Sequence, residues 1–450
     1  MIGIAISNSI GLSSAAAAID PAASAFIAAT GITNPTEQQA INNLVKGLKA
    51  DGIYSKMKAV YPFVTDNRNI FSYTEDFGNA FWFKDAVTIT NNSITAPNGT
   101  LTADSIVENT ANTQHYVGVL SGLTLTAVPY TISAYLKKAN RNWASVGLFN
   151  GTDSKSAWFN LDTGTIGTIN AGVTATIADA GNGWYRCSVT RTMAAVSNNF
   201  VAFSPQISDG SSSHLGNGLV GVYCWGAQLE LGSTATTYQP IATTQQAFIA
   251  NQFKYNLVNP VDSDAAFRLV FNGGWTHSSN GATPNGTNGY ADTKFNALNN
   301  FIASSRHMSF YNRTNTAKGY DMGCLLSPND TMLASRFTAT TSAYTCYGTS
   351  AGGYTTAITP TAVGFIQSSN ISNSEKLYKN GSSLATRTRT ITNINLPIFI
   401  GASNINSSAG EYTDHQCSFA SMGDGLTDTE AANLYTRVQA FQTALNRAVI

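Results

Sequence analysis

Residues Asp262–Phe295 read DSDAAFRLVFNGGWTHSSNGATPNGTNGYADTKF. The apolar run at residues 265–271 has the length of a strand, is rich in β-forming residues and is followed by Gly273-Gly274. The next segment is dense in Gly, Asn, Ser and Thr and contains the turn dipeptides Asn285-Gly286 and Asn288-Gly289. A strand, a wide polar loop and a second strand are how a β-sandwich begins, so this stretch predicts a mainly β domain.

The chain after this stretch continues the β pattern and closes with a helix. Asn380-Gly381 follows a short strand-like run and is typical of a hairpin turn, and residues 396–401 form another apolar run of strand length. Thr427 and Glu430 make the T-x-x-E pattern of a capping box. The apolar residues that follow at helical spacing are Leu434, Val438, Phe441 and Leu445. We therefore expect one sandwich over residues 253–450 with a C-terminal helix.

Helices are also predicted before residue 64. Asp20-Pro21 and Asn34-Pro35 each place an N-cap residue before a proline at the first helical position. In the second helix, residues at positions i, i+3, i+4 and i+7 form one apolar stripe: Ile41, Leu44, Val45 and Leu48. A further short helix is expected over residues 53–60. The stripe packs either against the chain's own sandwich or against copies of itself in a homo-oligomer, and the sequence leaves both open.

Residues 69–240 change to short strands in which apolar and polar side chains alternate. Assigning the aliphatic side of each strand to a core leaves four aromatic residues and one arginine on the outer, otherwise polar side: Tyr135, Trp143, Trp158, Trp184 and Arg186. Sugar rings stack on exposed aromatic planes while their hydroxyls bond to polar neighbours. These residues are therefore predicted to bind a glycan. The alternative is that a loop or a neighbouring subunit covers them, so that they form an interface.

Two parts of the chain resemble known families. Residues 266–296 resemble a segment that recurs in bacteriophage virion surface proteins whose C-terminal half is a concanavalin A/laminin-G-type sandwich. There the segment usually follows closely on a helical segment similar to residues 32–64. The block between them here resembles a carbohydrate-binding jelly roll at residues 70–82, 179–189 and 222–240. The resemblance implies a tail fibre, spike or head-fibre protein with a jelly roll inserted before its concanavalin A-like domain.

The amino-acid composition of the chain argues against some classes of function. Charged residues make up 11% of the 450 residues, against about 25% in an average protein. Basic and acidic residues balance at 25 each and no basic cluster occurs, which argues against nucleic-acid binding. No run is long and apolar enough to cross a membrane. Residues 1–19 lack the basic start of a signal peptide, and we expect them to be a tail that docks on other virion proteins.

The five cysteines form no C-x-x-C or Cys/His metal motif. Most are expected to be buried apolar residues. Cys324 and Cys346 would form a disulfide if the protein is kept outside a cell, and the sequence leaves this open.

Catalytic patterns are missing from the sequence. The acidic residues do not match the E-x-D-x-x-E strand motif of concanavalin A-like glucanases, the five histidines are dispersed, and neither G-x-S-x-G nor H-E-x-x-H occurs. We therefore predict a protein that is not an enzyme and has no cofactor. A structural calcium ion is the one metal considered, with Glu75, Asp76 and Glu230 as its candidate ligands, because relatives of such sandwiches hold calcium through loop acids.

The sequence thus predicts a mainly β protein of four segments. These are a docking tail (1–19), a helical segment (20–64), a jelly-roll module (69–240) and a concanavalin A-like sandwich (253–450). We expect a virion surface component that contacts host or environmental glycans without cleaving them, as a homo-oligomer, with a trimer favoured by analogy with fibres and spikes. The alternatives are a capsid decoration protein with a structural role and a glycan depolymerase, which needs a carboxylate pair in a groove.

Overall fold

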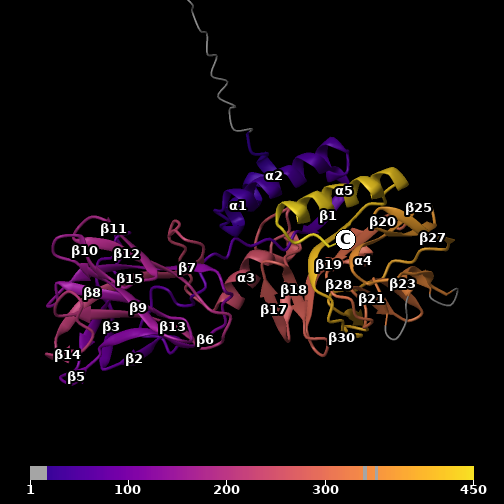
Figure 1. The fold of residues 1–450 in the computed structure, drawn as a ribbon. Coiled ribbons are helices and arrows are strands. Elements are labelled where there is room, and N and C mark those ends of the chain that lie inside the picture. Colours follow the sequence, from indigo (N-terminus) through magenta and orange to yellow (C-terminus); the bar gives the residue numbers. More distant parts are fainter. Residues whose placement is uncertain (1–17, 338–341, 350–352, 450) are drawn as a thin grey trace, which may run out of the picture. The chain divides into compact units, whose positions relative to one another are not determined.

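The computed structural model describes residues 18–337, 342–349 and 353–449 (Figure 1). Contacts divide the chain into unit 1, which joins the residues up to Asp66 to those from Ile249 onward, and unit 2, Asn67–Phe248. Both units are built mainly from antiparallel sheets, which confirms the predicted fold class. Most of the predicted docking tail, residues 1–17, lies outside the described residues.

Unit 2 is a sandwich of two six-stranded sheets. Sheet I has the strand order β10 (Thr165–Ile169), β9 (Ser154–Asn160), β8 (Trp143–Phe149), β13 (Asn199–Gln206), β6 (Tyr116–Leu123), β2 (Phe83–Asp85). Sheet II has the order β11 (Val173–Asp179), β12 (Trp184–Thr192), β7 (Pro129–Lys138), β15 (Val220–Leu231), β4 (Ala103–Glu108), β3 (Val87–Ile94). The short strands β5 (Asn112–Thr113) and β14 (His214–Leu215) pair separately.

The core of unit 2 lies between these two sheets. The alternating aliphatic residues that the sequence assigned to a core are fully buried there, among them Ile132, Ala134, Leu136, Ala144, Val146, Leu148 and Phe159. Because side chains alternate across a strand, the intervening residues of the same strands lie on the two outer faces of the sandwich.

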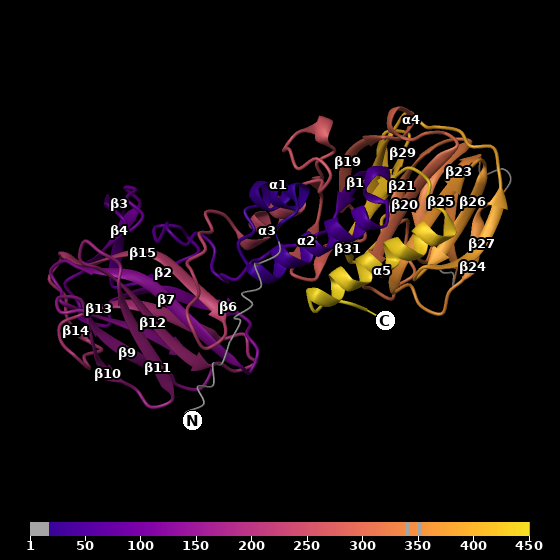
Figure 2. The same ribbon diagram turned by 90° about the horizontal axis from the view of Figure 1, so that it is seen from above.

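Unit 1 holds two larger sheets and most of the helices (Figure 2). The first sheet runs β17 (Trp275–Ser278), β18 (Gly281–Pro284), β31 (Cys417–Gly423), β20 (Ser305–Asn312), β25 (Gly364–Ile371), β26 (Ser374–Lys379), β27 (Ser382–Thr388), with β1 (Met57–Tyr61) also paired to β31. The second runs β16 (Val270–Asn272), β19 (Tyr290–Asn296), β28 (Pro397–Ile400), β21 (Met322–Leu326), β22 (Asn329–Ala334), β23 (Ser342–Thr349), β24 (Thr355–Ile358), with β29 (Ser403–Ile405) paired to β21 and β30 (Ser408–Gly410) paired to β29.

The longer helices of unit 1 begin where the sequence predicts. Helices α1 (Pro21–Thr30) and α2 (Pro35–Ala50) are capped by the side chains of Asp20 and Asn34, and α5 (Asp428–Ala444) begins with the Thr427–Glu430 capping box. Two short helices, α3 (Gln245–Phe253) and α4 (Ala297–Asn300), complete the set.

The predicted apolar stripe of α2 is buried inside its own chain. Ile41, Leu44, Val45 and Leu48 belong to one core with residues of α5 and of the outer face of the first sheet, such as Leu434 and Phe365. Of the two alternatives for this stripe, packing against the chain's own sandwich is the one observed.

Two local predictions are wrong. Residues 53–60 do not form a helix: after a short 3₁₀ turn, Tyr54–Lys56, the chain becomes β1, because its backbone pairs with β31. The apolar run 265–271 is not one strand either. Phe267 adopts a left-handed conformation with φ 60° after a 3₁₀ turn, and its carbonyl oxygen accepts a hydrogen bond from the hydroxyl of Tyr61 at 2.7 Å. Tertiary contacts override the local propensity in both cases.

The thiols of all five cysteines are free and buried, so the disulfide considered between Cys324 and Cys346 is not formed. The two residues lie on β21 and β23, which are separated by β22. Two strand spacings amount to about 10 Å, which is beyond the reach of a disulfide.

The chain leaves unit 1 and returns to it at one place. The amide of Leu257 donates to the carbonyl oxygen of Val60 at 2.8 Å, and the amide of Val60 donates to Oδ1 of Asn256 at 2.9 Å. Gln252, in α3, donates through Nε2 to Oδ1 of Asp66 at 3.2 Å. These bonds hold together the two segments of unit 1 between which unit 2 is inserted. We call these paired segments the base of the insertion.

Arg447 joins the end of the chain to this base. It is 1% exposed, and its burial lowers the pKa to about 9, which leaves it charged at neutral pH. Its guanidinium donates to five oxygens: those of the Phe63 carbonyl (2.6 Å), the Pro62 carbonyl (2.7 Å), the Ser418 carbonyl (3.0 Å), the Ser279 carbonyl (3.1 Å) and the Gln442 side chain (2.6 Å).

We predict that Arg447→Met lowers the free energy of unfolding of unit 1 by about 3–5 kcal/mol, because buried carbonyl oxygens lose their donor. Urea unfolding, with hydrogen exchange read on peptides of unit 1, measures this. Arg437→Met is the matched control: its ion pair with Asp51 lies near the surface and is worth less than about 1 kcal/mol. Equal effects of the two substitutions would contradict the role given to Arg447.

Candidate functional site

The five residues predicted to bind a glycan do not share one face. Trp143 and Trp158 belong to β8 and β9 and lie on the outer face of sheet I, whereas Tyr135, Trp184 and Arg186 belong to β7 and β12 and lie on the outer face of sheet II. The alternation of each strand was assigned correctly, but alternation does not tell which strands share a sheet.

Part of the outer face of sheet II, around Trp184 and Tyr135, is covered by the chain itself. Trp184 is 1% exposed and its indole nitrogen donates to the carbonyl oxygen of Thr95 at 3.1 Å. The ring of Tyr135 is partly buried and lies 5.2 Å from that of Trp225, against a small separate core.

Arg186 takes part in the same packing. Its guanidinium donates to the carbonyl oxygen of Thr236 at 2.6 Å and to Oγ of Ser133 at 3.0 Å, and it lies over the ring of Tyr135. Tyr135, Trp184 and Arg186 therefore take part in packing within unit 2, which is the alternative that the sequence analysis left open for them.

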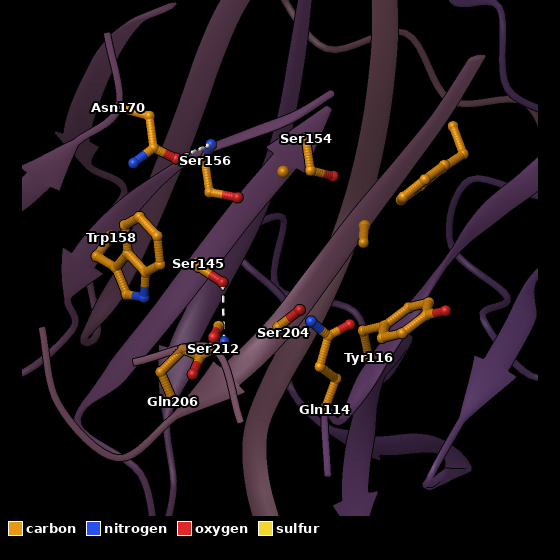
Figure 3. Close-up of a pocket in the computed structure, with 13 residues that line it drawn as sticks. Gln114, Tyr116, Ser145, Ser154, Ser156, Trp158, Asn170, Ser204, Gln206 and Ser212 are labelled. Atoms are coloured by element: carbon orange, nitrogen blue, oxygen red, sulfur yellow. Dashed lines mark hydrogen bonds between the residues drawn. The ribbon is translucent and has the colours of Figure 1, made fainter. Parts of the chain in front are cut away.

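The outer face of sheet I carries a groove of about 240 Å³ (Figure 3). Its lining comes from β6, β8, β9 and β13 and from three loops: Gln114, Tyr116, Ser145, Gly147, Ser154, Ser156, Trp158, Asn170, Phe200, Ala202, Ser204, Gln206 and Ser212. Of the five predicted residues only Trp158 is in this set. The charged residue types Asp, Glu, Lys and Arg are absent from it.

The floor of the groove is hollow because small residues stand side by side on adjacent strands. Gly147 of β8 is paired with Ser156 of β9 on one side and with Ala202 of β13 on the other, and Ala202 is paired with Gly118 of β6. A Cβ added to Gly147 would come 2.8 Å from Oγ of Ser156. Side chains of ordinary size at these positions would fill the space.

Aromatic side chains stand around this floor. Trp158 is 7% exposed, and its indole nitrogen donates to the carbonyl oxygen of Ser211 at 2.6 Å, which fixes the ring. Phe200 stacks on Phe149 with ring centroids 5.0 Å apart, and Tyr116 lies on β6. Flat apolar surfaces at the sides of a polar floor suit a ligand with flat apolar faces and polar edges.

The polar groups of the groove divide into fixed and available ones. Gln206 donates to Oγ of Ser145 at 3.0 Å and accepts from Ser211, while Oδ1 of Asn170 accepts from the amide of Ser156 at 2.8 Å. Three further hydroxyls point toward the groove without a hydrogen bond to any described residue, those of Ser154, Ser156 and Ser204. They are positioned to bond to ligand hydroxyls.

Trp143 lies on the same face as the groove but outside its lining. A Cβ added to Gly167 of the edge strand β10 would come 2.6 Å from the Trp143 ring, so this ring packs against the edge of sheet I. Trp143 is therefore the one predicted aromatic residue that shares the face of the groove without contributing to it.

The sequence did not identify most of the lining. The missed signal is the small residues that alternate with core positions, Ser145 and Gly147 on β8, Ser154 and Ser156 on β9, and Ala202 and Ser204 on β13. Small residues on several strands of one face mark a hollow, but their adjacency appears only once the strand order is known.

A buried charged network supports one wall of the groove from behind. His115 stands between Gln114 and Tyr116, and His214 follows Ser212 after one residue. The Arg141 guanidinium and Nε2 of His214 lie 2.7 Å and 3.1 Å from oxygens of Glu108, whose side chain is 0% exposed. The rings of His115 and His214 lie 4.7 Å apart.

The candidate calcium ligands are not brought together as a site. Within the described part of the chain, no group of three or more His, Cys, Asp or Glu side chains could hold a metal ion. Glu230 is already bonded by Gln228 and Thr236. The oxygen Oδ1 of Asp76 accepts from Asn91, and Oε1 of Glu75 accepts from the hydroxyl of Tyr238.

Of the described helices, none combines the length and the apolar character that crossing a membrane requires.

Comparison with known proteins finds no matching family model and no matching curated protein. Similar solved structures include domain 4 of AbnA, an extracellular arabinanase of Geobacillus stearothermophilus, in complex with arabinotriose (16% identity, 38% of this chain and 90% of that chain, TM-score 0.29). TmCBM61 in complex with β-1,4-galactotriose is another (12% identity, 37% and 100%, TM-score 0.22). Domains LG4-5 of the mouse laminin α1 chain are a third (10% identity, 71% and 90%, TM-score 0.27). At these scores no function is transferred to this chain.

We predict that acidification destabilises the wall that carries Gln114 and Ser212. Burial outweighs the neighbouring Glu108 and lowers the pKa of His214 below its usual 6.5. The unfolded chain then binds more protons than the folded one, so stability falls as the pH drops below 6.5. Burial alone would raise the pKa of Glu108, but its hydrogen bonds with Arg141 and His214 outweigh the burial and lower this pKa. The stability that ionised Glu108 gives to the folded state is therefore lost as the pH falls below 4.5.

Hydrogen exchange between pH 7 and pH 5, corrected for the intrinsic rate, measures this on peptides that contain residues 112–116 and 211–215. In the control His214→Gln, protection of these peptides should change less with pH, because the titrating ring is gone. Protection that is independent of pH in the unsubstituted protein would contradict the prediction.

Proposed function

We propose that the groove of sheet I binds a neutral glycan and does not cleave it. The observation that carries this proposal is the combination of a hollow floor of small residues, aromatic sides and uncharged hydroxyl and amide groups. Sugar rings have apolar faces for the aromatic sides and hydroxyls for the polar groups. The lack of lining cations disfavours ligands that carry phosphate, sulfate or carboxylate groups.

The chemistry of the lining also supports binding without catalysis. Hydrolysis of a glycosidic bond ordinarily needs two carboxyl groups on either side of the bond, and the groove lining includes no Asp or Glu. The depolymerase alternative therefore finds no support in this groove.

The wider role that we propose is that of a bacteriophage surface protein, a fibre, spike or head-fibre component displayed on the virion. It rests on the sequence resemblance of residues 266–296 and of the block 69–240. In this proposal unit 2 contacts host or environmental glycans and the N-terminal tail docks on other virion proteins, with a trimer as the expected assembly. A capsid decoration protein without glycan affinity is the alternative.

We predict that Ala202→Leu and Trp158→Ala each weaken glycan binding by at least about tenfold, which is 1.4 kcal/mol. The leucine side chain would fill the centre of the floor, and loss of the indole removes one side of the groove. Screening the full chain on an array of neutral oligosaccharides and host cell-surface polysaccharides, followed by calorimetric titration of the best ligand, measures the effect.

Trp143→Ala is the matched control, because it removes an indole from the same face of sheet I but outside the groove. The affinity of this variant for the glycan should stay within about twofold of that of the unsubstituted protein. The absence of any glycan ligand for the unsubstituted protein, or unchanged binding by Ala202→Leu, would overturn the proposal. Shortened glycan products after incubation would overturn its non-catalytic part.

A further inference from the structure

The groove is one part of a longer path across sheet I. In one row across the strands Trp158 of β9 is paired with Ser145 of β8, and Ser145 with Ser204 of β13. Because Phe203 is paired with Val117, Ser204 stands opposite Tyr116 of β6. The row thus has an aromatic residue at each end and two serines between them.

The adjacent row of paired residues reaches the edge strand of the sheet, one strand beyond Tyr116. Gly147, Ala202 and Gly118 follow one another on neighbouring strands, and Gly118 is paired with Phe83 of the edge strand β2. A Cβ on Gly118 would come 2.1 Å from the carbonyl oxygen of Val201, so this position has to remain bare. Gly118 therefore places no side chain between the floor of the groove and Phe83.

Phe83 is an exposed aromatic residue at the end of this path. It is 44% exposed, and its ring centroid lies 6.2 Å from that of Tyr116, with 37° between the ring planes. Paired residues of antiparallel strands point to the same face, so Phe83 and Tyr116 both stand on the face of the groove. Together they make a second apolar surface, on the opposite side of the floor from Trp158.

We infer that the ligand is an oligosaccharide chain that lies across the strands, with Trp158 at one end and Phe83 and Tyr116 at the other. This inference rests on the proposed function. From β9 to β2 the path crosses four strand spacings, or about 19 Å, which corresponds to several linked sugar rings. Asp85, paired with Tyr116 at the Phe83 end, disfavours acidic sugars there.

The test uses the full chain and a series of neutral oligosaccharides of one to six units, built from the sugar that binds best on the array. Affinity should rise at least about tenfold from one unit to about four, because each added ring reaches a further part of the path. Phe83→Ala should lower the affinity for the long chains by about fivefold or more and leave the shortest binding ligand within twofold.

Leu101→Ala is the control, since Leu101 is an apolar residue of unit 2 that is 62% exposed and does not line the groove. It should bind every length as the unsubstituted protein does. Equal affinity for one unit and for six units, or an unchanged affinity of Phe83→Ala for the long chains, would overturn this inference and leave the proposed function standing. Absence of binding to any neutral glycan would instead overturn the proposed function.

Discussion

The closed base of the insertion is the constraint on which the architecture depends. The segments that lead out of unit 1 and back into it both contribute to the core of unit 1, through residues such as Val60 and Leu257, so they have to stay side by side. The backbone bond between these two residues and the carboxamide of Asn256 hold them there, and Arg447 fastens the last residues of the chain to the same place.

The two faces of the strands of unit 2 differ: one packs into the core, and the other carries the groove on sheet I. The aliphatic residues of both sheets meet in the core, and a second small core around Trp184 and Trp225 covers part of the outer face of sheet II. Sheet I is left with an outer face where the central residues are small, Gly147 and Ala202 among them. A hollow there costs little stability, because the core lies on the other side of the strands.

Much of the fold could be predicted from local patterns, because capping boxes, helical stripes and strand alternation depend on neighbours in the sequence. The first residues of α1 and α5 and the hairpin at Asn380-Gly381 follow from such patterns. The groove could not be predicted in this way, since it depends on β8, β9 and β13 being adjacent. The outward side of each strand was assigned correctly, but the five outward residues belong to two opposite sheets and do not form one site. Of the five, Trp158 alone lines the groove.

The arrangement at the base also has an evolutionary consequence. Since groups of unit 1 already bond the two connecting segments to each other, the pairing inside unit 1 does not depend on what is encoded between them. Recombination can exchange the intervening cassette for another whose own ends lie close together. If unit 2 binds a glycan as proposed, a gene of this design can acquire a new binding specificity in one genetic event, while unit 1 is inherited unchanged.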